Sequence, residues 1–175
     1  MTSQKDLSVK PDLKPGQEVA TLAGGCFWGM EDLVRKLPGV VDTEVGYTGG
    51  HTPNPTYLAV KHGDTGHAET LQVIFEPAKI SFEEILKFYF RMHDPTTADR
   101  QGNDIGSQYR SAIFFHSEAQ RETAEKMKKF AETKWGKPVV TEVVPAMPFY
   151  RAEEFHQDYL ERYPDGYTCH WLREW

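Results

Sequence analysis

The residue best placed to do chemistry is Cys26, which stands where a strand pattern passes into a helix pattern. It follows Gly24-Gly25, and apolar residues at helical spacing predict a helix over residues 26–37. Unpaired N–H groups and the positive end of the dipole stabilise an anion at a helix start. A free cysteine is most often a small buried hydrophobe. This position instead favours a nucleophilic thiol with a lowered pKa, because the thiolate is the attacking form.

Two aromatic residues and one carboxyl could complete a pocket around this thiol. Phe27 and Trp28 follow the cysteine directly, so one ring can pack inward while the other faces the pocket. Glu69 stands where a long loop enters an apolar strand. A carboxyl packed beside rings has a raised pKa and can donate a proton near neutral pH. The alternative for Glu69 is a solvent-facing side chain at the edge of a strand.

Three polar residues in long loops are further candidates. Tyr57 ends the segment P-N-P-T-Y at 53–57, in which two prolines stiffen the backbone and aim the ring. Asp104 and Tyr109 lie in G-N-D-I-G-S-Q-Y-R at 102–110, just before a predicted strand. Taken singly, Asp104 is explained by turn chemistry and Tyr109 by cross-strand packing.

The histidines and cysteines exclude some kinds of site and leave others open. Two cysteines, Cys26 and Cys169, are too few for a disulfide scaffold or a four-cysteine metal site. No histidine pair has metal-ligand spacing on a clear helix, although seven are present: His51, His62, His67, His93, His116, His156 and His170. A cysteine–histidine hydrolase or acyl-transfer enzyme therefore stays open.

Length and charge limit the class of protein. The chain has 175 residues and a net charge of −6, and its pI is about 5.6. An acidic chain binds polyanions poorly, so nucleic acid and anionic membranes are not expected as partners. Residues 1–16 lack the apolar core of a signal peptide, and no run of apolar residues is long enough to cross a membrane. We expect a cytoplasmic monomer.

Hydrophobic periodicity predicts strands that alternate with helices. Strands are predicted at 18–23, 40–47, 69–75, 111–115 and 139–144. One helix is predicted at 26–37, and two more begin after capping boxes, the first formed by Ser81 with Glu84 and the second by Ser117 with Gln120. The order β-α-β-β-α-β is typical of a ferredoxin-like split βαβ core. We therefore expect an α+β two-layer sandwich with a mainly antiparallel sheet and helices on one face.

The remaining segments divide the chain into an arm, a domain and a tail. Residues 1–16 are expected to form a flexible N-terminal arm, and residues 17–175 a single catalytic domain. The connections 48–68 and 93–110 are long for so compact a domain, which favours functional loops. From Pro145 the pattern dissolves into an irregular, aromatic-rich C-terminal tail with short helical pieces over 152–162.

Several motifs occur in the order seen in one family. G-C-F-W-G at 25–29 resembles the active-site signature of the peptide methionine sulfoxide reductase A family. The resemblance continues through G-Y-T-G-G at 46–50, the 53–57 segment, H-A-E at 67–69, the 102–110 segment, F-Y at 149–150 and E-E-F-H-Q at 153–157. It covers residue 18 to the C-terminus, and it agrees with an α+β fold.

The resemblance implies a role for each candidate residue. Cys26 matches the nucleophile that attacks the sulfoxide sulfur, and Glu69 the proton donor to the oxygen. Tyr57 and Tyr109 match the hydroxyls that bind that oxygen. The rings that receive the ε-methyl group are matched by Phe27 and Trp28, and Asp104 matches a residue that positions substrate or water. The implied reaction reduces the S epimer of methionine sulfoxide, free or in proteins.

The second cysteine completes the implied redox cycle. The sulfenic acid formed on Cys26 would condense with Cys169, and thioredoxin or another dithiol would reduce the disulfide, with no metal or other cofactor. Alternatively, Cys169 is passive and an external thiol resolves the sulfenic acid. A further alternative is an aromatic-lined module that only binds methionine sulfoxide or peptides.

Overall fold

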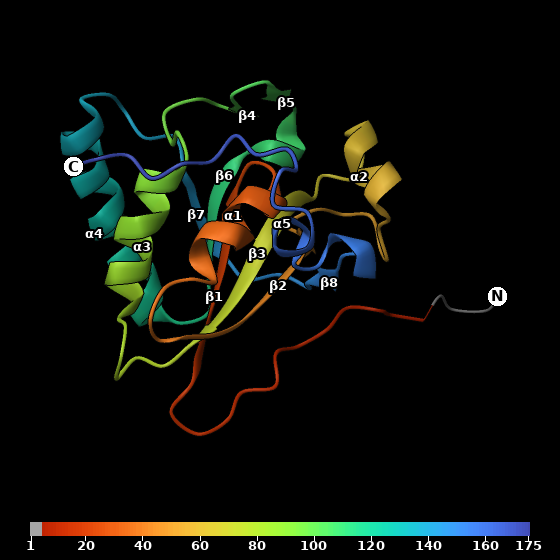
Figure 1. The fold of residues 1–175 in the computed structure, drawn as a ribbon, viewed down its shortest axis with the longest axis horizontal. Coiled ribbons are helices and arrows are strands. Elements are labelled where there is room, and N and C mark those ends of the chain that lie inside the picture. The colour runs from red at the N-terminus through yellow and green to blue at the C-terminus, as the bar shows by residue number, and fades with distance from the viewer. Residues whose placement is uncertain (1–4) are drawn as a thin grey trace.

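The computed structural model describes residues 5–175, in which helices pack on a six-stranded sheet (Figure 1). The strands lie in the order β7-β6-β1-β3-β2-β8. Their bounds are β1 Glu18–Gly24, β2 Val40–Thr48, β3 Ala68–Phe75, β6 Ser111–Phe115, β7 Glu142–Pro145 and β8 Tyr150–Arg151. β3 is antiparallel to both β1 and β2, β6 is antiparallel to β1, and β8 is antiparallel to β2. β7 pairs with β6 in parallel.

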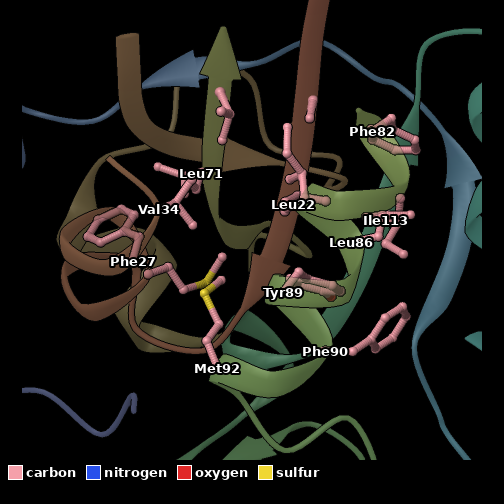
Figure 2. Packing of buried hydrophobic residues seen from close by; sticks show 14 of the residues in the cluster. Leu22, Phe27, Val34, Leu71, Phe82, Leu86, Tyr89, Phe90, Met92 and Ile113 are labelled. Carbon is pink, nitrogen blue, oxygen red and sulfur yellow. The ribbon is translucent and has the colours of Figure 1, made fainter. Parts of the chain in front are cut away.

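Three helices contribute to one core on a single face of this sheet. They are α1 (Phe27–Val34), α3 (Phe82–Met92) and α4 (Glu118–Trp135). Leu22, Leu71 and Ile113 are register partners on β1, β3 and β6, and they point toward α1 and α3 (Figure 2). Side chains alternate across a strand, so every second strand residue enters this core.

The expected α+β class is confirmed, with a mostly antiparallel sheet. The ferredoxin-like description stays an interpretation of the four strands β6-β1-β3-β2, because β7 and β8 widen the sheet beyond them. The first four predicted strands are present within one residue of their expected ends. The capping box of Ser81 and Glu84 is also confirmed.

Three local predictions need correction. The strand expected over 139–144 begins at Glu142, because the Val140 N–H donates to the carbonyl of Pro95 instead of to the sheet. The second capping box is half made: Ser117 accepts from the Gln120 N–H, but the Gln120 side chain accepts from the His116 N–H. The first helix ends at Val34, three residues before its expected end.

The two long connections are not simple loops. The first contains helix α2 (Tyr57–His62), which Thr56 caps with its side chain. The second contains the hairpin of β4 (Arg100–Gln101) and β5 (Asp104–Ile105), followed by a 3-10 turn at Ser107–Tyr109. Each of these short elements carries one of the predicted site residues, so the connections position side chains more tightly than free loops would.

The two ends of the chain lie outside the six-stranded sheet and the helices α1, α3 and α4. Residues 5–16 leave β1 as an extended arm without helix, and Val9 bridges to Phe149 (Figure 1). The first four residues of the predicted arm lie outside the described residues. The tail after β8 forms a 3-10 turn at Glu154–His156 and a short helix α5 (Tyr159–Arg162), as the short helical pieces predicted. Among residues 5–175 no helix has both the length and the apolar character needed to span a membrane.

Candidate active site

Cys26 caps the N-terminus of α1, as the sequence predicted. Gly25 turns the chain into this helix with φ 99, which a glycine adopts readily. A Cβ at position 25 would lie 2.6 Å from Cγ of Gln101, so the backbone passes close to the β4–β5 hairpin. The thiol is buried, with Cys26 only 7% exposed.

The expected lowering of the Cys26 pKa is wrong for the thiol in this environment. Burial, followed by the charge of Glu69, raises the pKa of Cys26 well above its usual value. The Trp28 N–H lowers it, but by less than burial raises it. The helix start therefore favours the thiolate as predicted, and the desolvation of a buried sulfur outweighs this effect. Protonation of Glu69 removes the second cause.

Glu69 lies on β3 and is the buried acid of the site. The residue is 1% exposed, and its Oε1 accepts a hydrogen bond of 3.2 Å from the Phe27 N–H. Burial raises the pKa of Glu69 to about 8, so the carboxyl holds its proton at neutral pH. The alternative of a solvent-facing carboxyl at a strand edge is excluded by this burial.

The two tyrosines share the electrostatic environment of Cys26 and Glu69. Burial and then the charges of Glu69 and Cys26 raise the pKa of Tyr57 to about 12. Burial raises the pKa of Tyr109, and Glu69, Asp104 and Cys26 also raise it. Both hydroxyls therefore keep their protons. The structure thus brings α2, the 3-10 turn before β6 and the start of α1 to one place.

Phe27 and Trp28 occupy the inward and outward positions that were expected. Phe27 is fully buried, and its ring centroid lies 5.8 Å from that of Tyr47. Trp28 is partly exposed and stacks on Tyr159, with centroids 3.9 Å apart and planes at 15°. The Trp28 Nε1–H donates to Nδ1 of His156 over 3.0 Å. These contacts with Tyr159 and His156 fix the orientation of the indole.

The C-terminal tail crosses the start of α1. Nε2 of His170 hydrogen-bonds the carbonyl of Gly24 at 2.7 Å, and a Cβ at Gly29 would collide with Thr168 and His170. Cys169 is a half-buried free thiol that contributes to the electrostatics of Cys26. Its Sγ lies 3.7 Å from Oδ2 of Asp104. Burial, followed by Asp104, raises the pKa of Cys169 to about 11.

Asp104 contacts the C-terminal tail, and its charge also raises the pKa of Tyr57 and of Tyr109. Its Oδ2 accepts a hydrogen bond of 3.1 Å from the Tyr167 hydroxyl. This carboxylate therefore joins the β4–β5 hairpin to the segment that carries Cys169. Among residues 5–175 no group of three or more His, Cys, Asp or Glu side chains is arranged to hold a metal ion.

Sequence reasoning gave no role to Glu153 and His156, although both lie in the quoted 153–157 motif. Glu153 accepts from the Tyr47 hydroxyl at 2.9 Å and from the Tyr57 N–H at 3.0 Å. The buried His156 ring lies 4.3 Å from the ring of Tyr57 and 5.3 Å from that of Phe27. The 153–157 motif was the signal in the sequence that these two residues have a role. Their contacts join residues about a hundred positions apart, so only the folded structure shows them.

A family model described as peptide methionine sulfoxide reductase matches residues 18–174. The chain belongs to this family. The peptide methionine sulfoxide reductase MsrA of Pseudomonas fluorescens is 55% identical over 158 residues, which are 89% of this chain and 74% of that protein. That of Streptomyces avermitilis is 56% identical over 156 residues, 88% of this chain and 89% of that protein.

Solved structures of the reductase family agree with the fold. Reduced Mxr1 from Saccharomyces cerevisiae is similar with a TM-score of 0.89 at 44% identity, covering 93% of this chain and 96% of that one. Mxr1 in complex with Trx2 is similar with a TM-score of 0.66 at 32% identity, covering 94% and 96%. Family membership decides against the hydrolase and the binding module. The chain is a thiol-dependent peptide-methionine (S)-S-oxide reductase.

Proposed function

We propose that Cys26 and Glu69 carry out the oxygen transfer in this reductase. The Cys26 thiolate attacks the sulfoxide sulfur while Glu69 protonates the sulfoxide oxygen, which makes that oxygen a better leaving group. The oxygen passes to Cys26 as a sulfenic acid, and methionine leaves. The step is balanced, since a thiol and a sulfoxide give a sulfenic acid and a sulfide. The observation that carries this proposal is the buried, protonated Glu69 against the Phe27 N–H.

We propose that the neighbouring rings and hydroxyls bind the substrate. The hydroxyls of Tyr57 and Tyr109 keep their protons and can donate to the sulfoxide oxygen. Phe27 and Trp28 would receive the ε-methyl group, because these two apolar rings directly follow Cys26 at the start of α1. A pocket with the oxygen donors on one side and the rings on another distinguishes the two epimers at sulfur.

The epimers provide the test of this function. Purified protein is incubated with a dithiol and either pure (S)- or pure (R)-methionine sulfoxide, and the methionine formed is counted by chromatography. We expect the S epimer to be reduced at least about a hundredfold faster, since a site built for one arrangement of donors rejects the other strongly. Equal rates for the two epimers would contradict the assigned pocket.

We propose that Cys169 resolves the sulfenic acid on Cys26. Its thiol would displace the hydroxyl as water and form a disulfide, which a dithiol partner then reduces to two thiols. The position of Cys169 on a tail held across the start of α1 supports this pairing. The structure of yeast Mxr1 with Trx2 supports thioredoxin as the partner.

Cys169→Ser should stop the cycle after the first turnover when thioredoxin is the reductant. We expect a burst of methionine close to the amount of protein, followed by a steady rate reduced on the order of a hundredfold, because the sulfenic acid has no internal thiol to displace it. The burst is measured by rapid quench. Continued thioredoxin-dependent turnover at the wild-type rate would show that an external thiol resolves Cys26.

We also propose a domain organisation, a cofactor requirement, an oligomeric state and a location for the protein. Residues 17–175 act as a single catalytic domain with a split βαβ core, preceded by the arm of residues 1–16. The reaction uses no metal or organic cofactor, because a thiol and a carboxylic acid supply its chemistry. A cytoplasmic monomer fits a cycle in which thiols must be kept reduced.

A further inference from the structure

Lys5 and Leu7 of the N-terminal arm are hydrogen-bonded to Asn54, in the loop that carries Tyr57. The Leu7 N–H donates to Oδ1 of Asn54 over 2.8 Å, and Nδ2 of Asn54 donates to the carbonyl of Lys5 over 2.7 Å. Two residues further along, the Val9 N–H donates to the carbonyl of Phe149 over 2.8 Å. The Asn54 amide therefore pairs with the arm as the backbone of a neighbouring strand would.

The backbone between Asn54 and Tyr57 has little freedom. Asn54 itself has φ 48, a left-handed conformation that asparagine tolerates better than most residues. Pro53 and Pro55 flank it, and each proline ring fixes its own φ. Thr56 then caps α2, of which Tyr57 is the first residue. A displacement of Asn54 is therefore passed on to Tyr57.

The rest of this loop is held from the catalytic domain itself. The His67 ring bonds the Gly50 N–H at 3.0 Å and the Thr52 carbonyl at 2.6 Å, and Glu153 holds the Tyr57 N–H. Asn54, between these anchors, is held by the arm. The match to the family model begins at residue 18, so the arm lies outside the matched residues.

We propose that residues 5–9 form a strap that positions the Tyr57 loop for the reaction, with Asn54 as the positioning residue. This inference rests on the proposed role of Tyr57 in binding the sulfoxide oxygen. Asn54 does not touch the reacting atoms, so its effect is exerted through the backbone of residues 55–57. Small displacements of a group that acts on the transition state reduce the rate strongly.

The test compares two truncated chains. Deletion of residues 1–9 removes Lys5, Leu7 and Val9, whereas deletion of residues 1–4 leaves all three. We expect the longer deletion to lower kcat about threefold to tenfold, the effect of one or two net hydrogen bonds, and the shorter one to leave kcat unchanged. Rates are normalised to the folded fraction of each preparation, measured by near-UV circular dichroism, so that a loss of folded protein does not count as a loss of positioning.

Point variants separate the strap from general stability. Leu7→Pro removes the N–H that donates to Asn54, and Leu7→Ala keeps it while removing the same exposed side chain. Asn54→Gly removes both hydrogen bonds but tolerates the positive φ. Because Asn54 and the arm act as one unit, Asn54→Gly in the chain lacking residues 1–9 should cost no more than the deletion alone.

Hydrogen exchange gives a readout that does not depend on the reaction. The amides of Thr56 and Tyr57 should exchange faster in the chain lacking residues 1–9 and in Leu7→Pro, and at the wild-type rate in Leu7→Ala. Unchanged exchange, unchanged kcat, or additive losses in the double variant would each overturn the strap. A Tyr57→Phe variant with full activity would instead overturn the role of Tyr57 in the proposed function, whatever the exchange rates show.

Discussion

Cys26→Ser is expected to fold normally and to reduce no detectable methionine sulfoxide. Loss of a nucleophile lowers the rate on the order of 10⁶-fold, because the remaining groups can only bind the substrate. Folding is preserved, since Cys26 occupies the N-cap of α1 and serine is a favoured N-cap residue. The rate of methionine formation and the thermal midpoint are measured together on the same preparation.

The outcome separates catalysis from binding. A folded but inactive Cys26→Ser protein whose thermal midpoint still rises when (S)-methionine sulfoxide is added supports the assignment of Cys26 as the nucleophile in an intact pocket. Cys169→Ser is the matched control, because it removes the other thiol by the same change and retains the first turnover. Full activity in Cys26→Ser would contradict the nucleophile.

Glu69→Gln should slow the reduction about 10²- to 10⁴-fold, the usual contribution of a general acid. The amide keeps an oxygen that can accept from the Phe27 N–H, so the start of α1 is preserved. The charge of Glu69 raises the pKa of Cys26, so alkylation of the thiol should proceed at least as fast in the variant. Equal losses of reduction and alkylation would argue against an acid role.

The pH dependence of kcat/KM gives a second test of Glu69 as the acid. The pKa of Glu69 is about 8 in the folded protein and that of Cys26 lies higher, so wild-type kcat/KM should rise with the thiolate fraction up to pH 8 and then level off, as the acid loses its proton. Glu69→Gln should lack that levelling-off, and its kcat/KM should keep rising above pH 8 as more of the Cys26 thiol ionises. Glu31→Gln is the matched control: burial raises the pKa of Glu31 to about 7, but its oxygens bind the Asp158 N–H and the Thr43 hydroxyl, away from the reacting atoms.

Glu69 also links catalysis to stability. A carboxyl whose pKa is raised on folding contributes stability below its unfolded pKa, and that contribution is lost as the pH rises through the folded value. Between about pH 4.5 and 8 the free energy of unfolding therefore falls through Glu69. Glu69→Gln should remove this slope, so an active-site change is expected to stabilise the protein at alkaline pH.

The sequence predicted the framework of the fold where one physical signal dominated. Short runs rich in apolar residues predicted β1, β3 and β6, and these strands are buried along almost their whole length. Ser81 and Glu84 placed the start of α3 by reciprocal capping. The Gly24-Gly25-Cys26 turn placed the thiol at the start of α1. These signals are local, so neighbouring residues were sufficient.

Features that depend on distant contacts could not be predicted in this way. The raised pKa of Cys26 comes from burial and from Glu69, and neither is visible in a helix-start motif. His156 lies against Trp28 only because the tail returns across α1. Asn54 has no role in the predictions from sequence, because its hydrogen-bond partners on the arm lie 47 and 49 residues away.

Transfer of the sulfoxide oxygen to Cys26 can be followed in a single turnover of Cys169→Ser without reductant. Methionine is counted against sulfenic acid trapped on Cys26 by a dione probe and located by peptide mass analysis. We predict equal amounts of methionine and labelled Cys26 from the S epimer. Methionine formed in that amount with Cys26 unlabelled and still a free thiol would contradict the account.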